Sequence, residues 1–191
     1  MNIQNIWENY FLKKRYIFAY KDYAENSDRV TLLSMDNPDI KHLISTSDLR
    51  FSKYLSMRQG NPNWVLFYYK ENDEILGYGF LHIPVKEEWN DCLPTVKGQA
   101  RVGSVYVYPK HRGKGIRGVI AKCQMQYSQE HNLKLWSVIE ASNNASIRAA
   151  SKTGFINRHN YLCKIIGVNI VSIMTNPFKV YLLLGDKRAR R

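Results

Sequence analysis

The sequence predicts one domain of the mixed α/β (α+β) class, in which helices flank a central, mostly antiparallel sheet. Strand-like and helix-like segments alternate along 191 residues, a length typical of a single domain. Hydrophobic residues at 45% and charged residues at 23% are ordinary for a chain that buries a core. Aromatic residues at 13% argue against disorder.

The first 25 or so residues show helical periodicity. Their apolar residues fall on one face at i, i+3, i+4, i+7 and i+8, namely Ile3, Ile6, Trp7, Tyr10 and Phe11. We expect residues 1–29 to form a helical extension packed on a domain that spans residues 30–186. The basic residues 13–15 follow this apolar face instead of preceding it, which argues against a secretory signal.

The first half of the domain is predicted to alternate between strand and helix. Residues 30–35 are strand-like, and residues 40–58 are expected to be helical. Residues 64–69 and 75–83 are rich in β-formers and flank an Asn-Asp-Glu turn, which predicts a hairpin. Residues 84–98 carry charges and two prolines and are expected to form a long loop.

The second half continues the same alternation. A strand over 100–108 ends at a proline, and residues 115–131 have one apolar helical face. Residues 133–139 are apolar on both alternating faces apart from one serine, as in a buried central strand. A short helix then ends at Gly154. Residues 161–166 and 179–184 are strand-like, residues 168–174 stay open, and residues 187–191 form a basic tail.

The charge is distributed unevenly along the chain. Residues 1–99 hold 12 Lys and Arg against 13 Asp and Glu, a net charge of −1. Residues 100–191 hold 16 against 3, a net charge of +13, which gives +12 for the whole chain. Such asymmetry indicates a polyanionic partner, for example nucleic acid, a membrane surface or a phosphorylated ligand.

Cysteine content and hydropathy exclude several classes of protein. Cys92, Cys123 and Cys163 are odd in number and far apart, which excludes a fully paired disulfide framework and a CxxC zinc site. The chain contains no run of 18 apolar residues, so no membrane-spanning helix is predicted. We therefore expect a cytoplasmic protein with reduced thiols and no metal, and a homodimer stays possible.

The segment from Val105 to Arg117 carries the clearest chemical signal. A strand enters a cationic loop that opens directly into a helix, and Gly113 and Gly115 allow a tight turn and close approach of a ligand. Amides at a helix start bind anions, and this start is flanked by four cations: Lys110, Arg112, Lys114 and Arg117. A diphosphate is the expected ligand, although neither a Walker A loop nor a Rossmann fingerprint is present.

Two motifs in order resemble the GNAT superfamily of acyl-CoA N-acyltransferases. The first, V-x-P-x-x-R-G-x-G-I, runs from Val107 to Ile116, and the second, N-x-x-S-I-R-x-x-x-K-x-G-F, runs from Asn143 to Phe155. A helix and a strand of the usual lengths separate them. The motif-bearing resemblance covers residues 100–156, and the hairpin before it fits the same fold more loosely.

The resemblance implies a fold and a cosubstrate. The strand ending at Val107 is expected to splay from the strand at 135–140, so that the pantetheine arm of acetyl-CoA lies between them and pairs with amides near Tyr106 and Val107. The pyrophosphate is expected on the backbone of His111, Arg112, Gly113, Lys114, Gly115 and Ile116. Asn143 either reaches the pantetheine or caps the following helix.

The chain departs from the family pattern at two positions. Lys110 stands where many members have Gln or Arg, which leaves anion binding intact. Ala150 stands where many members carry a Tyr that protonates the departing thiolate, and alanine cannot do so. Water, Tyr161 or Tyr106 are the candidates for that role.

Removal of a proton from the acceptor amine needs a base, and Glu140 is the leading candidate. It is the only acid on the predicted central strands between 100 and 143, and we expect its apolar neighbours Trp136, Val138 and Ile139 to raise its pKa. The alternative is a structural salt bridge with a nearby cation. The histidines His82, His111 and His159 are weaker candidates, and His111 fits anion binding better than base chemistry.

The resulting prediction is an N-acyltransferase that passes an acetyl group directly from acetyl-CoA to a primary amine, with no metal and no covalent intermediate. The basic second half favours an anionic acceptor such as a nucleotide-linked or phosphorylated small-molecule amine, with a protein or nucleic-acid acceptor also open. The alternatives are a non-enzymatic nucleic-acid-binding module and a degenerate acyl-CoA sensor.

Overall fold

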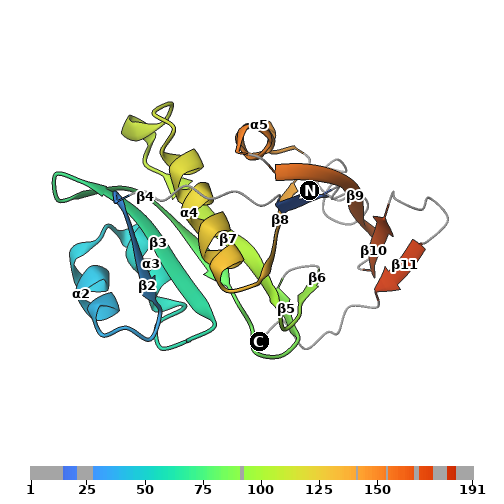
Figure 1. Ribbon diagram of the computed structural model, residues 1–191, viewed down its shortest axis with the longest axis horizontal. Helices are drawn as coiled ribbons and strands as arrows, with labels where there is room; N and C mark the ends of the chain where they lie inside the picture. Colours follow the sequence, from blue (N-terminus) through green and yellow to red (C-terminus); the bar gives the residue numbers. More distant parts are fainter. Residues whose placement is uncertain are drawn as a thin grey trace, which may run out of the picture.

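The computed structural model describes residues 15–20, 28–90, 93–140, 142–153, 155–165, 168–173 and 180–183. Its described strands form one nine-stranded sheet, and a two-stranded hairpin stands apart from it (Figure 1). In spatial order the strands are β11 (Val180–Leu183), β10 (Val168–Ile173), β9 (Phe155–Ile165), β1 (Arg15–Tyr20), β8 (Lys134–Glu140), β7 (Gln99–Val107), β4 (Glu74–His82), β3 (Trp64–Glu71) and β2 (Val30–Ser34).

Pairing within this sheet is antiparallel except between β7 and β8, which run parallel. The prediction of a mixed, mostly antiparallel sheet flanked by helices is confirmed. The predicted hairpin corresponds to β3 and β4, which pair from Trp64↔His82 to Glu71↔Glu74.

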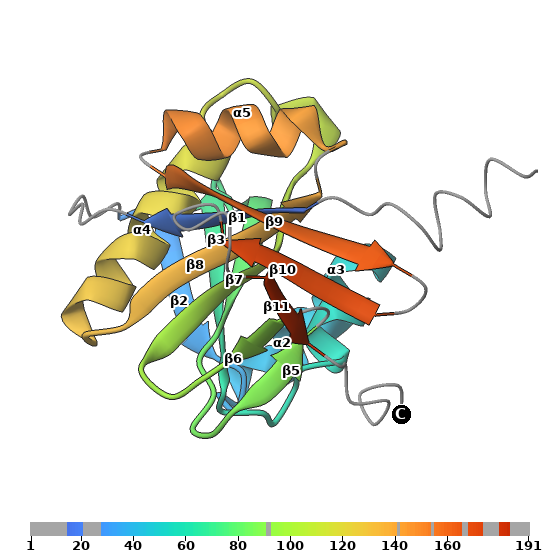
Figure 2. The same cartoon turned by 90° about the vertical axis from the view of Figure 1, so that its right-hand side faces the viewer.

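Helices cover both faces of the sheet, as Figure 2 shows from the side. On one face α4 (Ile116–Glu130) packs its apolar residues, among them Ile116, Ile120 and Cys123, against the sheet, with α5 (Asn144–Lys152) beside it. On the other face α2 (Asp39–Thr46) and α3 (Leu49–Ser56) pack against β3 and β4. The sheet therefore separates two apolar cores, and β7 lies between them.

The predicted N-terminal helix is wrong over residues 15–20. These residues form strand β1, which pairs antiparallel with β8 on one side and with β9 on the other, so they belong to the central sheet and not to a separate extension. The segment reads Arg-Tyr-Ile-Phe-Ala-Tyr, which is rich in β-formers, and two strand edges satisfy its backbone. The remaining residues of that prediction, 1–14 and 21–27, lie outside the described part of the chain.

Two further expectations change in detail. The predicted helix over 40–58 is two helices, because Ser47 is extended and Asp48 begins α3 by accepting hydrogen bonds from the amides of Arg50 and Phe51. The predicted loop over 84–98 contains the short hairpin β5 (Glu88–Asn90) and β6 (Leu93–Thr95).

Near the C-terminus the strand expected at 161–166 already begins at Phe155, and the open segment forms β10. The strand expected over 179–184 is present as β11. The basic tail at 187–191 lies outside the described residues.

Candidate functional site

The centre of the sheet opens between β7 and β8. Their parallel register covers only Gln99↔Lys134, Ala100↔Leu135 and Arg101↔Trp136. Beyond that point β7 stays paired with β4 up to Val107, and β8 stays paired with β1 up to Glu140. The two strands therefore diverge from a vertex at Arg101 and Trp136, and the predicted splay is confirmed. Inner-edge backbone groups beyond the vertex are left for another partner.

A β-bulge lies on β7 just beyond the vertex. Tyr106 pairs with Tyr78 and Gly103 pairs with Phe80, so Ser104 and Val105 stand opposite the single residue Gly79. Ser104 adopts a φ of 35°, which is uncommon for a residue other than glycine. Such a bulge bends the strand and changes the direction of its side chains. Strand β7 is thus shaped for the divergence from β8.

The loop that follows β7 leads into α4. A 3₁₀ turn over Pro109–His111 is followed by Gly113 and Gly115 at φ values of 82° and 77°, in the left-handed region that favours glycine. The first bonds into the helix come from the amides of Gly118 and Val119, which both donate to the carbonyl of Gly115. The amides of His111 and Arg112 donate within the loop to the carbonyls of Tyr108 and Pro109, at 2.9 and 3.2 Å. No side chain caps α4, so the backbone from Gly113 to Ile116 is the part of this helix start that remains for a ligand. We call residues 108–115 the phosphate loop.

The four cations predicted around this loop do not act alike. Lys110 forms an ion pair with Glu74, the first residue of β4, and so holds the loop on the hairpin. His111 Nε2 lies 3.5 Å from the same carboxylate. Arg117 donates to Ser146 Oγ at 3.0 Å and joins α4 to α5. Arg112 and Lys114 stay exposed, and Arg112 Nε donates to the carbonyl of Val107 at 3.2 Å.

Asn143 serves as the N-cap of α5. Its Oδ1 accepts a hydrogen bond from the amide of Ser146 at 3.0 Å. The sequence left open whether this side chain caps the helix or reaches a ligand, and the structure shows the cap. The side chains of Val107 and Ile116 belong to the apolar core on the α4 side of the sheet.

The two proposed catalytic residues are not brought together. Glu140 is the last residue of β8 and is exposed, and its Cα lies opposite Arg15 in the pairing with β1. The enclosure by apolar residues that the sequence predicted is therefore absent. Tyr161 lies on β9, and β1 runs between it and β8, so the backbones are separated by about 10 Å, twice the strand spacing.

Ala150 is 3% exposed and packs against Ile139 and Ile147. It is a core residue of α5. The position at which the family resemblance implies a tyrosine is therefore occupied in this chain by a buried packing residue.

The sequence analysis missed a set of residues on the opposite side of β7. Arg50, Tyr54 and Arg58 follow one another at i, i+4 and i+8 along α3 and just beyond it. The Arg50 guanidinium carbon lies 4.1 Å from the ring centre of Tyr106, and that of Arg58 lies 5.4 Å from Tyr54. The helical spacing of Arg50, Tyr54 and Arg58 was the only sign in the sequence that these side chains share a face. We call these three residues the arginine stripe.

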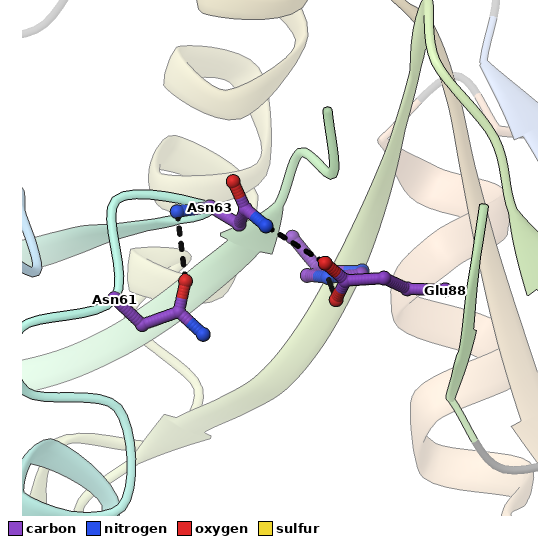
Figure 3. A network of polar contacts seen from close by, with 4 residues as sticks. Asn61, Asn63 and Glu88 are labelled. Carbon is purple, nitrogen blue, oxygen red and sulfur yellow. Dashed lines mark hydrogen bonds and ion pairs between the residues drawn. The ribbon is translucent and has the colours of Figure 1, made fainter. Parts of the chain in front are cut away.

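A buried polar network stands at the end of β4, near the vertex (Figure 3). His82 is fully buried, and its Nε2 lies 2.9 Å from Glu88 Oε2, while Glu88 Oε1 accepts from Asn63 Nδ2 at 2.8 Å. Burial lowers the pKa of His82, Arg101 and Arg58 lower it further, and only Glu88 opposes the shift. The contact between His82 Nε2 and Glu88 ties the start of β5 to the main sheet.

A cavity of about 800 Å³ lies between α2, α3 and the outer strands of the sheet and reaches Tyr108 and Lys110 of the phosphate loop. Several of its acids have partners within it. Tyr108 donates to Asp48, Lys70 pairs with Asp73 at 2.8 Å, and Lys110 pairs with Glu74. These contacts stabilise the walls of the cavity.

The family model described as "Acetyltransferase (GNAT) family" matches residues 28–155 of the chain, more than half of its length. The chain belongs to the GNAT acetyltransferase family. Its matched part includes the hairpin, the divergent strands and the phosphate loop.

Solved GNAT structures share the fold. A putative acetyltransferase from Novosphingobium aromaticivorans gives a TM-score of 0.55 at 12% identity and covers 77% of this chain. A family member from Colwellia psychrerythraea gives 0.54 at 14% identity over 82%, and one from Sphaerobacter thermophilus gives 0.53 at 17% over 83%. The alignments span 60%, 58% and 53% of those chains, so this GNAT chain matches little more than half of each.

No curated protein matches this GNAT chain. Within the described residues, no helix is long and apolar enough to cross a membrane. The same residues contain no group of three or more His, Cys, Asp or Glu placed to hold a metal ion.

Proposed function

We propose that this GNAT chain is an N-acyltransferase that passes an acetyl group from acetyl-CoA directly to a primary amine. The observation that carries the proposal is the divergence of β7 and β8 beside the glycine-bearing phosphate loop. Beyond the vertex, the inner edges of β7 and β8 offer backbone groups to a ligand. The loop that follows β7 offers the amides of a helix start. An extended ligand with a diphosphate at one end matches this arrangement.

The fit to CoA rests on the loop. Positive φ angles at Gly113 and Gly115 aim successive amides in one direction, and no heavy atom of the protein outside the immediate chain neighbours lies within 4 Å of a Cβ built on either residue. The sequence predicted that the backbone from His111 to Ile116 holds the diphosphate, but the amides of His111 and Arg112 already donate to Tyr108 and Pro109. The amides from Gly113 to Ile116 would therefore hold it, with the side chains of Arg112 and Lys114 adding charge. The amides near Tyr106 and Val107 would pair with the pantetheine arm, with Asn143 at the facing end of β8.

The chemistry is nucleophilic attack on a thioester. The amine nitrogen forms a bond to the carbonyl carbon, the carbon–sulfur bond breaks, and the thiolate leaves and takes a proton from water. Strand amides beyond the vertex stabilise the oxyanion of the intermediate. Glu140, which is exposed at the end of β8, is the proposed acceptor of the amine proton, directly or through water. Tyr161 stays a weaker candidate acid because β1 separates its strand from β8.

One rival function has an observation in its favour. Because Ala150 is a core residue, a chain that binds acyl-CoA without turnover, as a sensor, is consistent with the site. A non-enzymatic nucleic-acid-binding module has only the basic composition of the second half to support it.

Two measurements separate these functions. Calorimetry with CoA tests the loop, and release of free thiol from acetyl-CoA across several classes of amine tests the transfer. We expect binding together with amine-dependent thiol release. Binding without release for every amine would favour the sensor. Absence of CoA binding together with nucleic-acid binding that weakens steeply with salt would favour the basic module.

A further inference from the structure

The arginine stripe faces β7 on the side of the sheet opposite α4. Arg50 stacks on Tyr106 of β7, and Arg58 Nη2 lies 3.4 Å from Ser104 Oγ at the bulge. The stripe thus runs along the divergent strand beyond the vertex. Because α4 covers the other face of β7, the acceptor would approach the thioester from the α3 face, where the stripe lies. The phosphate loop borders this face too, since the guanidinium carbon of Arg112 lies 5.7 Å from the ring centre of Tyr106.

Arg58 is a partly buried cation that pairs with no carboxylate of the described residues. Its guanidinium carbon lies 4.4 Å from the ring centre of Trp64 and 4.6 Å from that of Phe80, and Nη1 donates to the carbonyl of Tyr54 at 3.0 Å. Its Nε is buried and has no hydrogen-bond partner. No ion pair among the described residues includes Arg50 or Arg58. Partial desolvation of a guanidinium is costly, and no carboxylate of the described residues offsets it at Arg58, which points to an anion supplied from outside.

The surroundings favour an oxyanion over any other ligand group. Guanidinium groups present planar forks of N–H donors that match carboxylate and phosphate oxygens. Stacking on Tyr106, Trp64 and Phe80 holds the two guanidinium planes in place, so less freedom is lost when an anion binds. Arg101, whose guanidinium carbon lies 5.5 Å from the Trp136 ring centre at the vertex, adds a third positive charge on this face.

We propose that the arginine stripe binds a carboxylate or phosphate group of the acceptor, so that the substrate is a primary amine that also carries an oxyanion. The proposal rests on the proposed acyl transfer and names the acceptor class for the same site. It places Arg50 and Arg58 of the nearly neutral first half, on α3 and the segment just after it, at the oxyanion, with Arg101 of the basic half as a neighbouring charge. The aromatic rings beside the stripe would border the body of the acceptor.

The test uses matched pairs of amines that differ in one group. O-phosphoethanolamine is compared with ethanolamine for phosphate, and L-tyrosine with tyramine for carboxylate, with free thiol release from acetyl-CoA as the readout. We expect the anionic member of at least one pair to have a kcat/KM about tenfold to a hundredfold higher, as the loss of one charge-assisted hydrogen bond implies. The pair that shows the preference identifies the oxyanion.

Variants then assign the preference to the stripe. Arg58→Gln and Arg50→Gln should each reduce the preference by raising KM for the anionic amine, with the CoA affinity unchanged. Arg58→Lys, which keeps the charge but loses the planar fork, should recover part of it. Arg29→Gln is the control, because Arg29 is an exposed arginine that pairs with Glu71 at the far edge of the sheet. Arg50 is exposed, so its variant should fold even if Arg58→Gln does not.

The failures of the two proposals are distinguishable. Equal or better turnover of the members that lack the oxyanion, or no turnover of any oxyanion-bearing amine by a protein that binds CoA, would overturn the acceptor class. An unchanged preference in the folded Arg50→Gln and Arg58→Gln variants would overturn the role of the stripe. Loss of CoA binding in the wild-type protein would instead refute the proposed acyltransferase.

Discussion

The phosphate loop and the arginine stripe flank the same strand, β7, but the chain builds them differently. The loop is eight consecutive residues whose chemistry depends on two glycines and on backbone amides. The stripe has its residues one helical turn apart on α3, and it becomes a cluster only because α3 packs over Tyr106 and Ser104. A site made of backbone is readable from a motif, whereas a site made of side chains from separate elements is not.

The comparison also bears on the expectation drawn from charge. The basic second half predicted an anionic partner, and that stays a prediction. In the structure, Lys110 and Arg117 of that half hold the loop and α5 in place, while Arg50 and Arg58 of the nearly neutral first half lie against β7 on the α3 face. The proposed acceptor site therefore draws on cations of the half with no net positive charge.

The largest expected effect comes from breaking the loop. Gly113→Val should abolish measurable CoA binding, because a β-branched residue is strained at a φ of 82° and its side chain would occupy the position of the diphosphate. Gly60→Val is the matched control, since Gly60 has a φ of 75° and equally open surroundings but lies in the turn before β3. Calorimetry with CoA on both variants checks this. Equal loss of affinity in both would show that strain, and not the loop, is responsible.

The second effect concerns Glu140, the proposed proton acceptor at the end of β8. Glu140→Gln keeps the shape of the side chain but removes its basicity, so kcat should fall by about 10² to 10⁴ at pH 7 while CoA still binds. The rate should partly recover at high pH, where the amine loses its proton without help. Steady-state kinetics from pH 6 to 9 check this, with Glu130→Gln, at the exposed end of α4, as the control. A wild-type rate across that range would make Glu140 structural.

The third effect concerns the contact that joins the two regions. Asp48 caps α3 and accepts a hydrogen bond from Tyr108 of the loop, so Asp48→Ala should lower the free energy of unfolding by about 1–2 kcal/mol. Tyr108→Phe removes only the second contact and should cost less. Urea denaturation of both variants measures this. If Tyr108→Phe costs as much as Asp48→Ala, the cap contributes nothing.

Protonation of Asp48 should weaken the same contact. Burial alone would raise the pKa of Asp48, but hydrogen bonds from Tyr108 and from the amides of Phe51 and Arg50 bring it below its ordinary value. The stabilisation is therefore present above about pH 3.9, the ordinary aspartate pKa, and is lost as the pH falls through the lower folded value.

A smaller effect follows from the polar network near the vertex. Because the folded pKa of His82 is lowered, mainly by burial, the unfolded chain binds a proton before the folded chain does. The free energy of unfolding should therefore fall as the pH drops below about 6.5, the ordinary histidine pKa. His82→Gln should flatten this part of the profile, whereas His42→Gln, at an exposed position of α2, should not. Thermal unfolding between pH 5 and 8 decides between them.

The smallest expected effect is none at all. Replacing Arg188, Arg190 and Arg191 with Gln removes three charges from the basic half and leaves every residue of the loop and the stripe unchanged. Calorimetry should give a CoA affinity within about twofold of the wild-type value, because no proposed CoA contact belongs to the tail and charges that make no direct contact are largely screened at physiological salt. A large loss would mean that the tail reaches the diphosphate.

The sequence by itself determined the sheet class, the hairpin, the helix after residue 115 and the phosphate loop, because each depends on local periodicity or on glycines at fixed positions. The two motifs also located the divergent strand pair. Asn143 shows the limit of such a reading, since its residue type fits both a cap and a ligand contact and only the bond to Ser146 separates them.

Tertiary structure decided the rest. Arg15–Tyr20 is a strand because two sheet edges accept it, although the residues before it have helical spacing. Glu140 is exposed and Ala150 is buried because of where β8 and α5 pack, which no pattern in their own segments reveals. The arginine stripe exists only where α3 crosses β7, because a site assembled from distant segments depends on packing between them and not on the order of residues along the chain.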